Sequence, residues 1–142
     1  MEIFIVILIL GIIAAIMVPK FSQASSESRL EDLISDLQMV RSQIELYKIQ
    51  HKELMPGQFA AGGYIEEEDF RLALTVKDDN GMGPYLNKLP RNYYIDDSKM
   101  RDAVTCVNNP ETTPTGQEGT GWWFNAATGE FRACDSLFHA AY

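Results

Sequence analysis

The stretch that decides the fold is IFIVILILGIIAAIMV, residues 3–18, sixteen consecutive apolar or small residues without a charge. A helix of this composition is too hydrophobic on every side to lie on the surface of a soluble domain. Sixteen helical residues extend about 24 Å, less than the hydrocarbon core of a bilayer, which is about 30 Å thick and needs about 20 residues. We therefore expect a helix that is buried either in a membrane or against other copies of itself.

Glu2 precedes this stretch and helps to distinguish a signal peptide, a membrane anchor and a helix that packs against copies of itself. A cleaved signal peptide carries basic residues before its apolar run, whereas only Met1 and Glu2 stand there. An ordinary membrane anchor does not begin with a carboxylate, because ionisable groups are costly in a bilayer. A helix that packs against copies of itself offers Glu2 a partner, and the alternative is a carboxylate in the lipid headgroup region.

The sequence EIFIVILILGIIAAIMVPKF, residues 2–21, closely resembles the N-terminal helix of type IV pilins and of type II secretion pseudopilins. That family has a glutamate near the start, a glycine, a pair of small residues and a proline, which correspond here to Glu2, Gly11, Ala14–Ala15 and Pro19. The resemblance covers residues 1–50 and is weak beyond them. The family's basic leader, cleavage glycine and usual phenylalanine start are absent, so we expect either that the sequence is truncated at its N-terminus or that its start is misassigned.

The resemblance implies roles in assembly for three residues. Glu2 is expected to pair with the free terminal amine of a neighbouring subunit and to set the register between subunits. Gly11 and Pro19 are expected to bound a stretch that unwinds in the filament. Glycine is a poor helix former and proline lacks the N–H of a helical hydrogen bond. A simple kink is the alternative, because membrane helices tolerate both residues.

Residues 20–55 are predicted to continue as an amphipathic helix, which Pro56-Gly57 ends. Its apolar residues recur at intervals of three and four, the spacing of one stripe along a helix: Leu30, Leu33, Ile34, Leu37, Val40, Ile44 and Tyr47. Met39, Leu46 and Ile49 lie off this stripe. We expect them to broaden the face that packs on the globular head, and contact with a neighbouring subunit is the alternative.

The rest of the chain divides into a connecting region, residues 56–99, and a β region, residues 100–142. The connecting region contains a predicted short helix, Ile65–Val76. Three strands are predicted in the β region, at Ala103–Val107, Gly121–Asn125 and Glu130–Cys134, the last two joined as a hairpin. Their aromatic side chains, Trp122, Phe124 and Phe131, are expected to pack on the helix stripe, and an aromatic ligand platform is the alternative.

The only two cysteines are Cys106 and Cys134. They fit either one disulfide in an oxidising compartment or two unrelated thiols. A disulfide that encloses the last strands is also a feature of many type IV pilins, so the resemblance favours the pairing. The polar loop between the strands, residues 108–120, contains Thr112, Thr113 and Thr115, which are compositional candidates for O-linked sugar.

Composition and motifs do not favour catalysis or nucleic-acid binding. The net charge of −8 repels phosphate backbones. Neither His51 nor His139 has metal-ligand spacing around it, and no nucleophile elbow or phosphate-binding glycine loop is present. Asp78-Asp79-Asn80-Gly81 is a turn that lacks the alternating ligands of a calcium loop. We therefore expect no enzyme activity, no metal and no cofactor.

The fold predicted from the sequence is α+β and pilin-like. Its long N-terminal helix has a membrane or filament-core half, residues 1–19, and an amphipathic half packed on a small C-terminal antiparallel sheet. The expected function is that of a structural subunit, a major or major-like pilin, which forms a homopolymer outside the cell. Expected partners are other copies, the pilus assembly machinery, a prepilin peptidase and, before assembly, the inner membrane. The alternatives are a type II secretion pseudopilin and a single-span membrane protein with a small extracytoplasmic binding domain.

Overall fold

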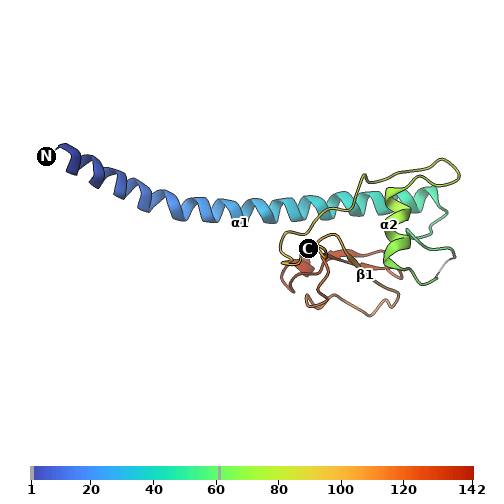
Figure 1. Ribbon diagram of the computed structural model, residues 1–142. Helices are drawn as coiled ribbons and strands as arrows, with labels where there is room; N and C mark the ends of the chain where they lie inside the picture. Colours follow the sequence, from blue (N-terminus) through green and yellow to red (C-terminus); the bar gives the residue numbers. More distant parts are fainter. Residues whose placement is uncertain (1, 61) are drawn as a thin grey trace. The chain divides into compact units, whose positions relative to one another are not determined.

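The computed structural model describes residues 2–60 and 62–142, except for the side chains of residues 2 and 14–25. The chain divides into two compact units, Met1–Asp32 and Leu33–Tyr142, which are treated separately below. One helix, α1 (Glu2–Gln50), contributes to both units (Figure 1). Leu33–Tyr142 is called the head from here on.

The predicted membrane-spanning half of the helix is not supported. No helix in the described part of the chain combines the length and the hydropathy needed to cross a bilayer. The apolar run with described side chains covers residues 3–13. The predicted fold class is wrong in this respect.

The head is built on the apolar stripe of α1. Leu33, Leu37, Val40, Ile44 and Tyr47 are all buried. They recur at intervals of three and four, so they share one side of the helix, and this part of the predicted stripe is confirmed.

The three apolar residues off the stripe do not broaden this core. Met39, Leu46 and Ile49 are exposed. At about 100° per residue, they lie on the side of α1 opposite the buried stripe. The expectation that they widen the core-facing side is therefore wrong.

Helix α1 ends six residues before Pro56, the residue expected to stop it. Lys52 and Glu53 both have positive φ angles, 56° and 65°. The backbone N–H of Glu53 donates to the carbonyl of Lys48 at 2.9 Å. This six-to-one hydrogen bond is the kind that closes a helix at a left-handed C-cap, so local backbone geometry ends the helix before the proline does.

The sheet of the head is mixed, and the prediction of an antiparallel sheet is wrong. Strands β1 (Val104–Val107), β2 (Trp122–Asn125) and β3 (Phe131–Ala133) lie in the order β1-β2-β3. The predicted hairpin is present, because β2 and β3 pair antiparallel. Strands β1 and β2 are parallel, with Val104 opposite Trp122. The loop between them returns the chain to the end of the sheet where β1 began, so β2 runs in the same direction.

Aromatic side chains fill the space between the sheet and the second helix, α2 (Glu67–Thr75). Phe70 on α2 lies against Phe124, with ring centroids 4.5 Å apart, and Trp122 stacks on Phe131 at 5.3 Å. The indole N–H of Trp122 donates to the carbonyl of Pro90 at 2.9 Å. Trp123, on the opposite face of the strand, is buried as well. Both faces of β2 are therefore covered, and the aromatic residues serve as core.

Candidate functional sites

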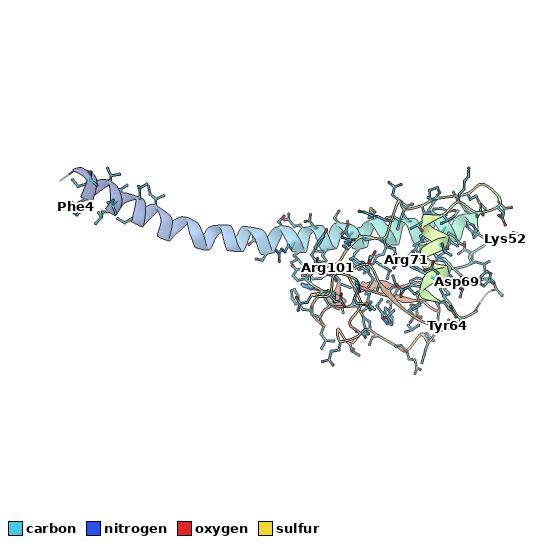
Figure 2. The ribbon with its side chains drawn as sticks, viewed as in Figure 1. Phe4, Lys52, Tyr64, Asp69, Arg71 and Arg101 are labelled. Atoms are coloured by element: carbon cyan, nitrogen blue, oxygen red, sulfur yellow. The ribbon has the colours of Figure 1, made fainter. Side chains whose placement is uncertain are left out.

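The first candidate site is the apolar segment of α1, residues 3–13. All of its side chains are exposed, with relative accessibilities from 48% at Ile13 to 77% at Phe4 among the large apolar ones. Figure 2 shows the side chain of Phe4 standing away from the helix. Ten of the eleven residues are large and apolar; the exception is Gly11. Single exposed apolar side chains are normal in soluble proteins, but a continuous exposed surface of this kind marks an interaction site.

The three predicted assembly residues lie on or beside this segment. Glu2 is the first residue of α1, and its side chain lies outside the described residues. No atom from elsewhere lies within 4 Å of the Cβ position that a side chain at Gly11 would occupy. Pro19 lies within α1, and its side chain is also among those that the structure does not describe. The backbone of Gly11–Pro19 is thus helical in the single chain, and the predicted unwinding in a filament stays a prediction.

The two cysteines are free thiols and do not form the predicted disulfide. Cys106 lies on β1, and Cys134 directly follows β3. Because β2 separates these two strands, the cysteines are at least two strand spacings apart, or more than about 9.6 Å. They are also offset along the sheet, since Cys106 lies opposite Phe124 and the residue before Cys134 lies opposite Trp122. A disulfide requires Cα atoms about 4.4–6.8 Å apart. The expectation assumed that the two strands are neighbours, which the observed strand order contradicts.

Each thiol has a pKa raised to about 12. Burial raises the pKa of Cys106, and the charge of Glu67 adds to the effect. Burial also raises the pKa of Cys134, together with its hydrogen bond to Glu118. The Cys134 Sγ atom lies 3.0 Å from Glu118 Oε2 and donates to it. Both thiols are therefore protonated at neutral pH, which makes them poor nucleophiles.

Glu118 organises the polar loop between β1 and β2. It accepts hydrogen bonds from the backbone and hydroxyl of Thr115, at 2.6 and 3.0 Å, and from the backbone of Gln117 at 2.9 Å. Partial burial acts to raise its pKa, but the hydrogen bonds from Thr115 and Cys134 prevail and lower the pKa to about 2. Its oxygens are occupied by contacts within the chain. Thr113 and Thr115 are exposed and Thr112 is half-buried, and their glycosylation stays a prediction.

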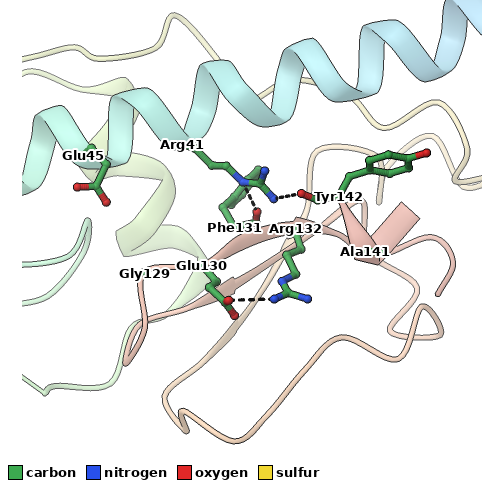
Figure 3. Close-up of a pocket in the computed structure, with 8 residues that line it drawn as sticks. All are labelled: Arg41, Glu45, Gly129, Glu130, Phe131, Arg132, Ala141 and Tyr142. Carbon is green, nitrogen blue, oxygen red and sulfur yellow. Dashed lines mark hydrogen bonds and ion pairs between the residues drawn. The ribbon is translucent and has the colours of Figure 1, made fainter. Parts of the chain in front are cut away.

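A cavity of about 360 Å³ lies between α1, β3 and the end of the chain (Figure 3). The Arg41 guanidinium crosses it and donates to the carbonyl oxygens of Phe131, at 2.9 Å, and Tyr142, at 2.6 Å. Burial and the nearby Arg132 lower the pKa of Arg41. Arg132 in turn pairs with Glu130 at 2.9 Å. Arg41 joins α1 to β3 and to the end of the chain, and no local sequence pattern indicates these contacts because the partners are 90 and 101 residues away.

The two histidines each lie beside a carboxylate. His51 Nε2 lies 3.2 Å from Asp78 Oδ2, and its Nδ1 lies 3.0 Å from the carbonyl of Tyr47. His139 Nδ1 contacts Asp135 Oδ2, and Asn92 donates to the other oxygen of Asp135 at 2.7 Å. Asp135 lies four residues before His139, a spacing that could have suggested the pair. His51 and Asp78 lie 27 residues apart, and nothing in the local sequence indicates their contact.

In residues 2–60 and 62–142, wherever side chains are described, no three His, Cys, Asp or Glu side chains converge as metal ligands. No family model, curated protein or solved structure matches the chain.

Proposed function

We propose that this chain is a structural subunit of an extracellular filament of the type IV pilus kind, assembled through its N-terminal helix. The observation that carries the proposal is the continuous apolar surface of residues 3–13, which has no cover in the single chain. The resemblance of residues 2–21 to the pilin helix supports it independently of the fold. In a filament core this surface is buried against the same segment of neighbouring copies.

The size of this surface supports the proposal, because its burial can offset the cost of association. A fully buried apolar side chain contributes about 1.5–3 kcal/mol. Ten such side chains at half that value contribute about 8–15 kcal/mol, which matches the 4–15 kcal/mol or so that association costs in lost freedom of motion. A segment exposed on all sides gains most where several neighbours surround it, and a helical bundle provides that arrangement.

The proposal includes partners and a location. Before assembly the subunit is held at the inner membrane, where a prepilin peptidase and the assembly machinery act on it. After assembly it stands at the cell surface as a homopolymer. Cys106 and Cys134 are free thiols, so no disulfide supports the export of the head. The proposal therefore depends on the N-terminal segment.

A charge placed within residues 3–13 tests this function. Leu8→Asp puts a carboxylate where neighbouring apolar helices pack, and an unpaired buried charge is strongly destabilising. We expect filaments to disappear while the head stays folded, as measured by electron microscopy and by circular dichroism of the purified chain. Ser28→Asp, an exposed site further along α1, is the matched control. Normal filament numbers from Leu8→Asp would refute the proposal.

A further inference from the structure

His51 directly follows the last residue of α1 and joins this helix to the chain after α2. Its Nδ1 atom lies 3.0 Å from the carbonyl oxygen of Tyr47, and its Nε2 atom lies 3.2 Å from Asp78 Oδ2. Figure 1 shows the chain after α2 running beside the end of α1. The His51 side chain is 14% exposed and that of Asp78 is 29% exposed, so the contact is largely shielded from water.

Both contacts of His51 form at once only when the ring carries two protons. A carbonyl oxygen accepts hydrogen bonds and cannot donate one, and the same holds for an ionised carboxylate. Desolvation acts to raise the pKa of Asp78, but hydrogen bonds, led by the one from the backbone of Met82, prevail and lower it. Asp78 is therefore ionised at neutral pH, and both of the groups that face the ring are acceptors.

A neutral imidazole cannot satisfy these two acceptors, because it has one N–H group and one bare nitrogen. In either tautomer the bare nitrogen of His51 faces an oxygen about 3 Å away, and the lone pairs of the two atoms repel each other. The ring then has to turn away from one of its partners. The neutral ring also loses the attraction of its positive charge to the Asp78 carboxylate. Loss of one proton therefore weakens the contact in both tautomers.

Apart from Asp78, the charged groups near His51 are paired or exposed. Lys48, one turn before His51 on α1, pairs with Glu45 at 3.1 Å. The other charged neighbours are exposed, so water and salt screen their fields. They are Lys52 and Glu53, which follow His51, and Lys77, which precedes Asp78.

Two tyrosine rings and α2 complete the surroundings of His51. The ring of Tyr47 stacks on the imidazole with centroids 3.8 Å apart, and Tyr85 meets it edge-on at 6.2 Å. Burial raises the pKa of both phenols, and the charge of Asp78 raises it further. Neither phenol therefore ionises near neutral pH. The side of α2 that faces this region carries the apolar side chains of Leu72, Ala73 and Val76.

Asp78 is also the centre of a turn, residues 78–82. Its Oδ1 atom accepts the backbone N–H of Met82 at 2.7 Å, and its own backbone N–H donates to the carbonyl of Met82 at 2.9 Å. His51 contacts the same carboxylate and so holds the whole turn against the end of α1. Residues 79–81 are exposed, and a segment with little buried surface opens locally at a low cost in free energy.

From this geometry we infer that His51 and Asp78 form a pH-sensitive clasp, which holds turn 78–82 against α1 when the imidazole carries two protons and loosens when it carries one. The second proton adds a hydrogen bond that exists only in the folded chain. Its stabilising effect is therefore present at the acid end of the range in which histidine changes charge, and it is lost as the pH rises through that range. The clasp lies within the head and does not depend on the assembly of filaments.

The test measures hydrogen exchange of the purified full chain by NMR at about pH 5.5 and about pH 8.5, on either side of the range of histidine. After correction for the intrinsic rate, the protection of the Met82 N–H should fall about tenfold at the higher pH, which corresponds to about 1.4 kcal/mol. Met82 should then exchange faster than Trp122, whose N–H donates to Ala103 beside the sheet at 3.0 Å, because the turn opens without the rest of the head.

Two variants and a matched control assign this change to the clasp. His51→Gln cannot titrate, so the dependence of Met82 protection on pH should disappear. Asp78→Asn keeps an oxygen that accepts the N–H of Met82 but carries no charge, and it should have the same effect. Asp79→Asn removes an exposed carboxylate at the next position and should leave the tenfold change in place.

Protection of Met82 that is the same at both pH values would overturn the inference, and so would a change that persists in His51→Gln. Equal exchange of Met82 and Trp122 at the higher pH would also overturn it, because the whole head would then be opening. The unmodified chain decides the matter if a variant fails to fold. Nitrogen chemical shifts of the His51 ring give the midpoint of its titration, and the fall in Met82 protection must have the same midpoint. Two different midpoints would contradict the clasp.

Discussion

The Nε atom of Arg41 donates a hydrogen bond to the carbonyl oxygen of Phe131 at 2.9 Å, which ties α1 to β3 across 90 residues of sequence. Strand β3 stands at one edge of the sheet. An edge strand presents unpaired carbonyl and amide groups that can recruit foreign strands. Arg41 donates to one of these carbonyls and to the backbone oxygen of Tyr142 with the same guanidinium. One side chain therefore ties the edge strand and the end of the chain to α1.

Replacing Arg41 should destabilise the head. Arg41→Met keeps most of the aliphatic stem but leaves two carbonyls without their donor. Hydrogen bonds to a charged group contribute about 1.5–3 kcal/mol, so we expect the free energy of unfolding to fall by about 1–3 kcal/mol. Urea denaturation measures the change. Arg91→Met is the control, because Arg91 is exposed; equal losses from both variants would show that the Arg41 contacts add no stability.

The two cysteines should behave as free thiols. Unreduced protein that is denatured and then alkylated should gain two labels, as measured by intact mass. Native protein should react slowly at neutral pH, because burial raises the pKa of both thiols to about 12 and only the thiolate is nucleophilic. A labelling count that rises only after reduction would show that Cys106 and Cys134 are bonded and that the observed strand order is wrong.

The Glu118 carboxylate should make stability depend on acid pH. Its pKa in the folded head is lowered to about 2 from an ordinary value of 4.5. A lowered pKa in the folded state contributes stability above the unfolded value, and this stability is lost as the pH falls from about 4.5 toward about 2. Glu118→Gln should therefore reduce the difference in urea midpoint between pH 6 and pH 3.

A second substitution in the same loop serves as the control for this pH effect. Glu111→Gln changes an exposed carboxylate and should leave the pH dependence as it is in the unmodified chain. If Glu118→Gln also leaves it unchanged, the hydrogen bonds around Glu118 do not perturb its titration.

Glu2 should control assembly without affecting the fold of the head. Glu2→Gln removes the charge that is expected to pair with the terminal amine of a neighbouring subunit. Because breaking a buried ion pair is strongly destabilising, we expect at least about a tenfold loss of filaments, counted by electron microscopy. Glu31→Gln, an exposed carboxylate further along α1, should assemble normally. Unchanged filament numbers from Glu2→Gln would remove Glu2 from the assembly mechanism.

The sequence predicted the parts of the fold that depend on local patterns. The spacing of Leu33, Leu37 and Val40 was sufficient to identify a buried helix face, because the period of an α-helix fixes which residues share a side. The hairpin between β2 and β3 followed from a short loop with a glycine between two apolar runs. Both signals are contained within a few consecutive residues.

The features that the sequence did not predict depend on contacts between distant residues. The direction of β1 relative to β2 is set by the path of residues 108–121, whose polar composition fits either direction. The separation of Cys106 and Cys134 follows from the same strand order. The partners of Arg41 and His51 lie 90 and 27 residues away, beyond the reach of any local periodicity. Long-range topology therefore accounts for the errors in the sheet and in the disulfide.

The most direct test of the proposed function is a helical reconstruction, by electron cryomicroscopy, of filaments sheared from cells that produce this chain, with mass spectrometry to identify the subunit. The account predicts filaments built from this chain, with residues 3–13 buried in the core and the heads facing outward. It also predicts that residues 11–19 lack helical hydrogen bonds in the assembled state. Surface preparations without filaments of this chain, or filaments in which residues 3–13 face solvent, would contradict the account.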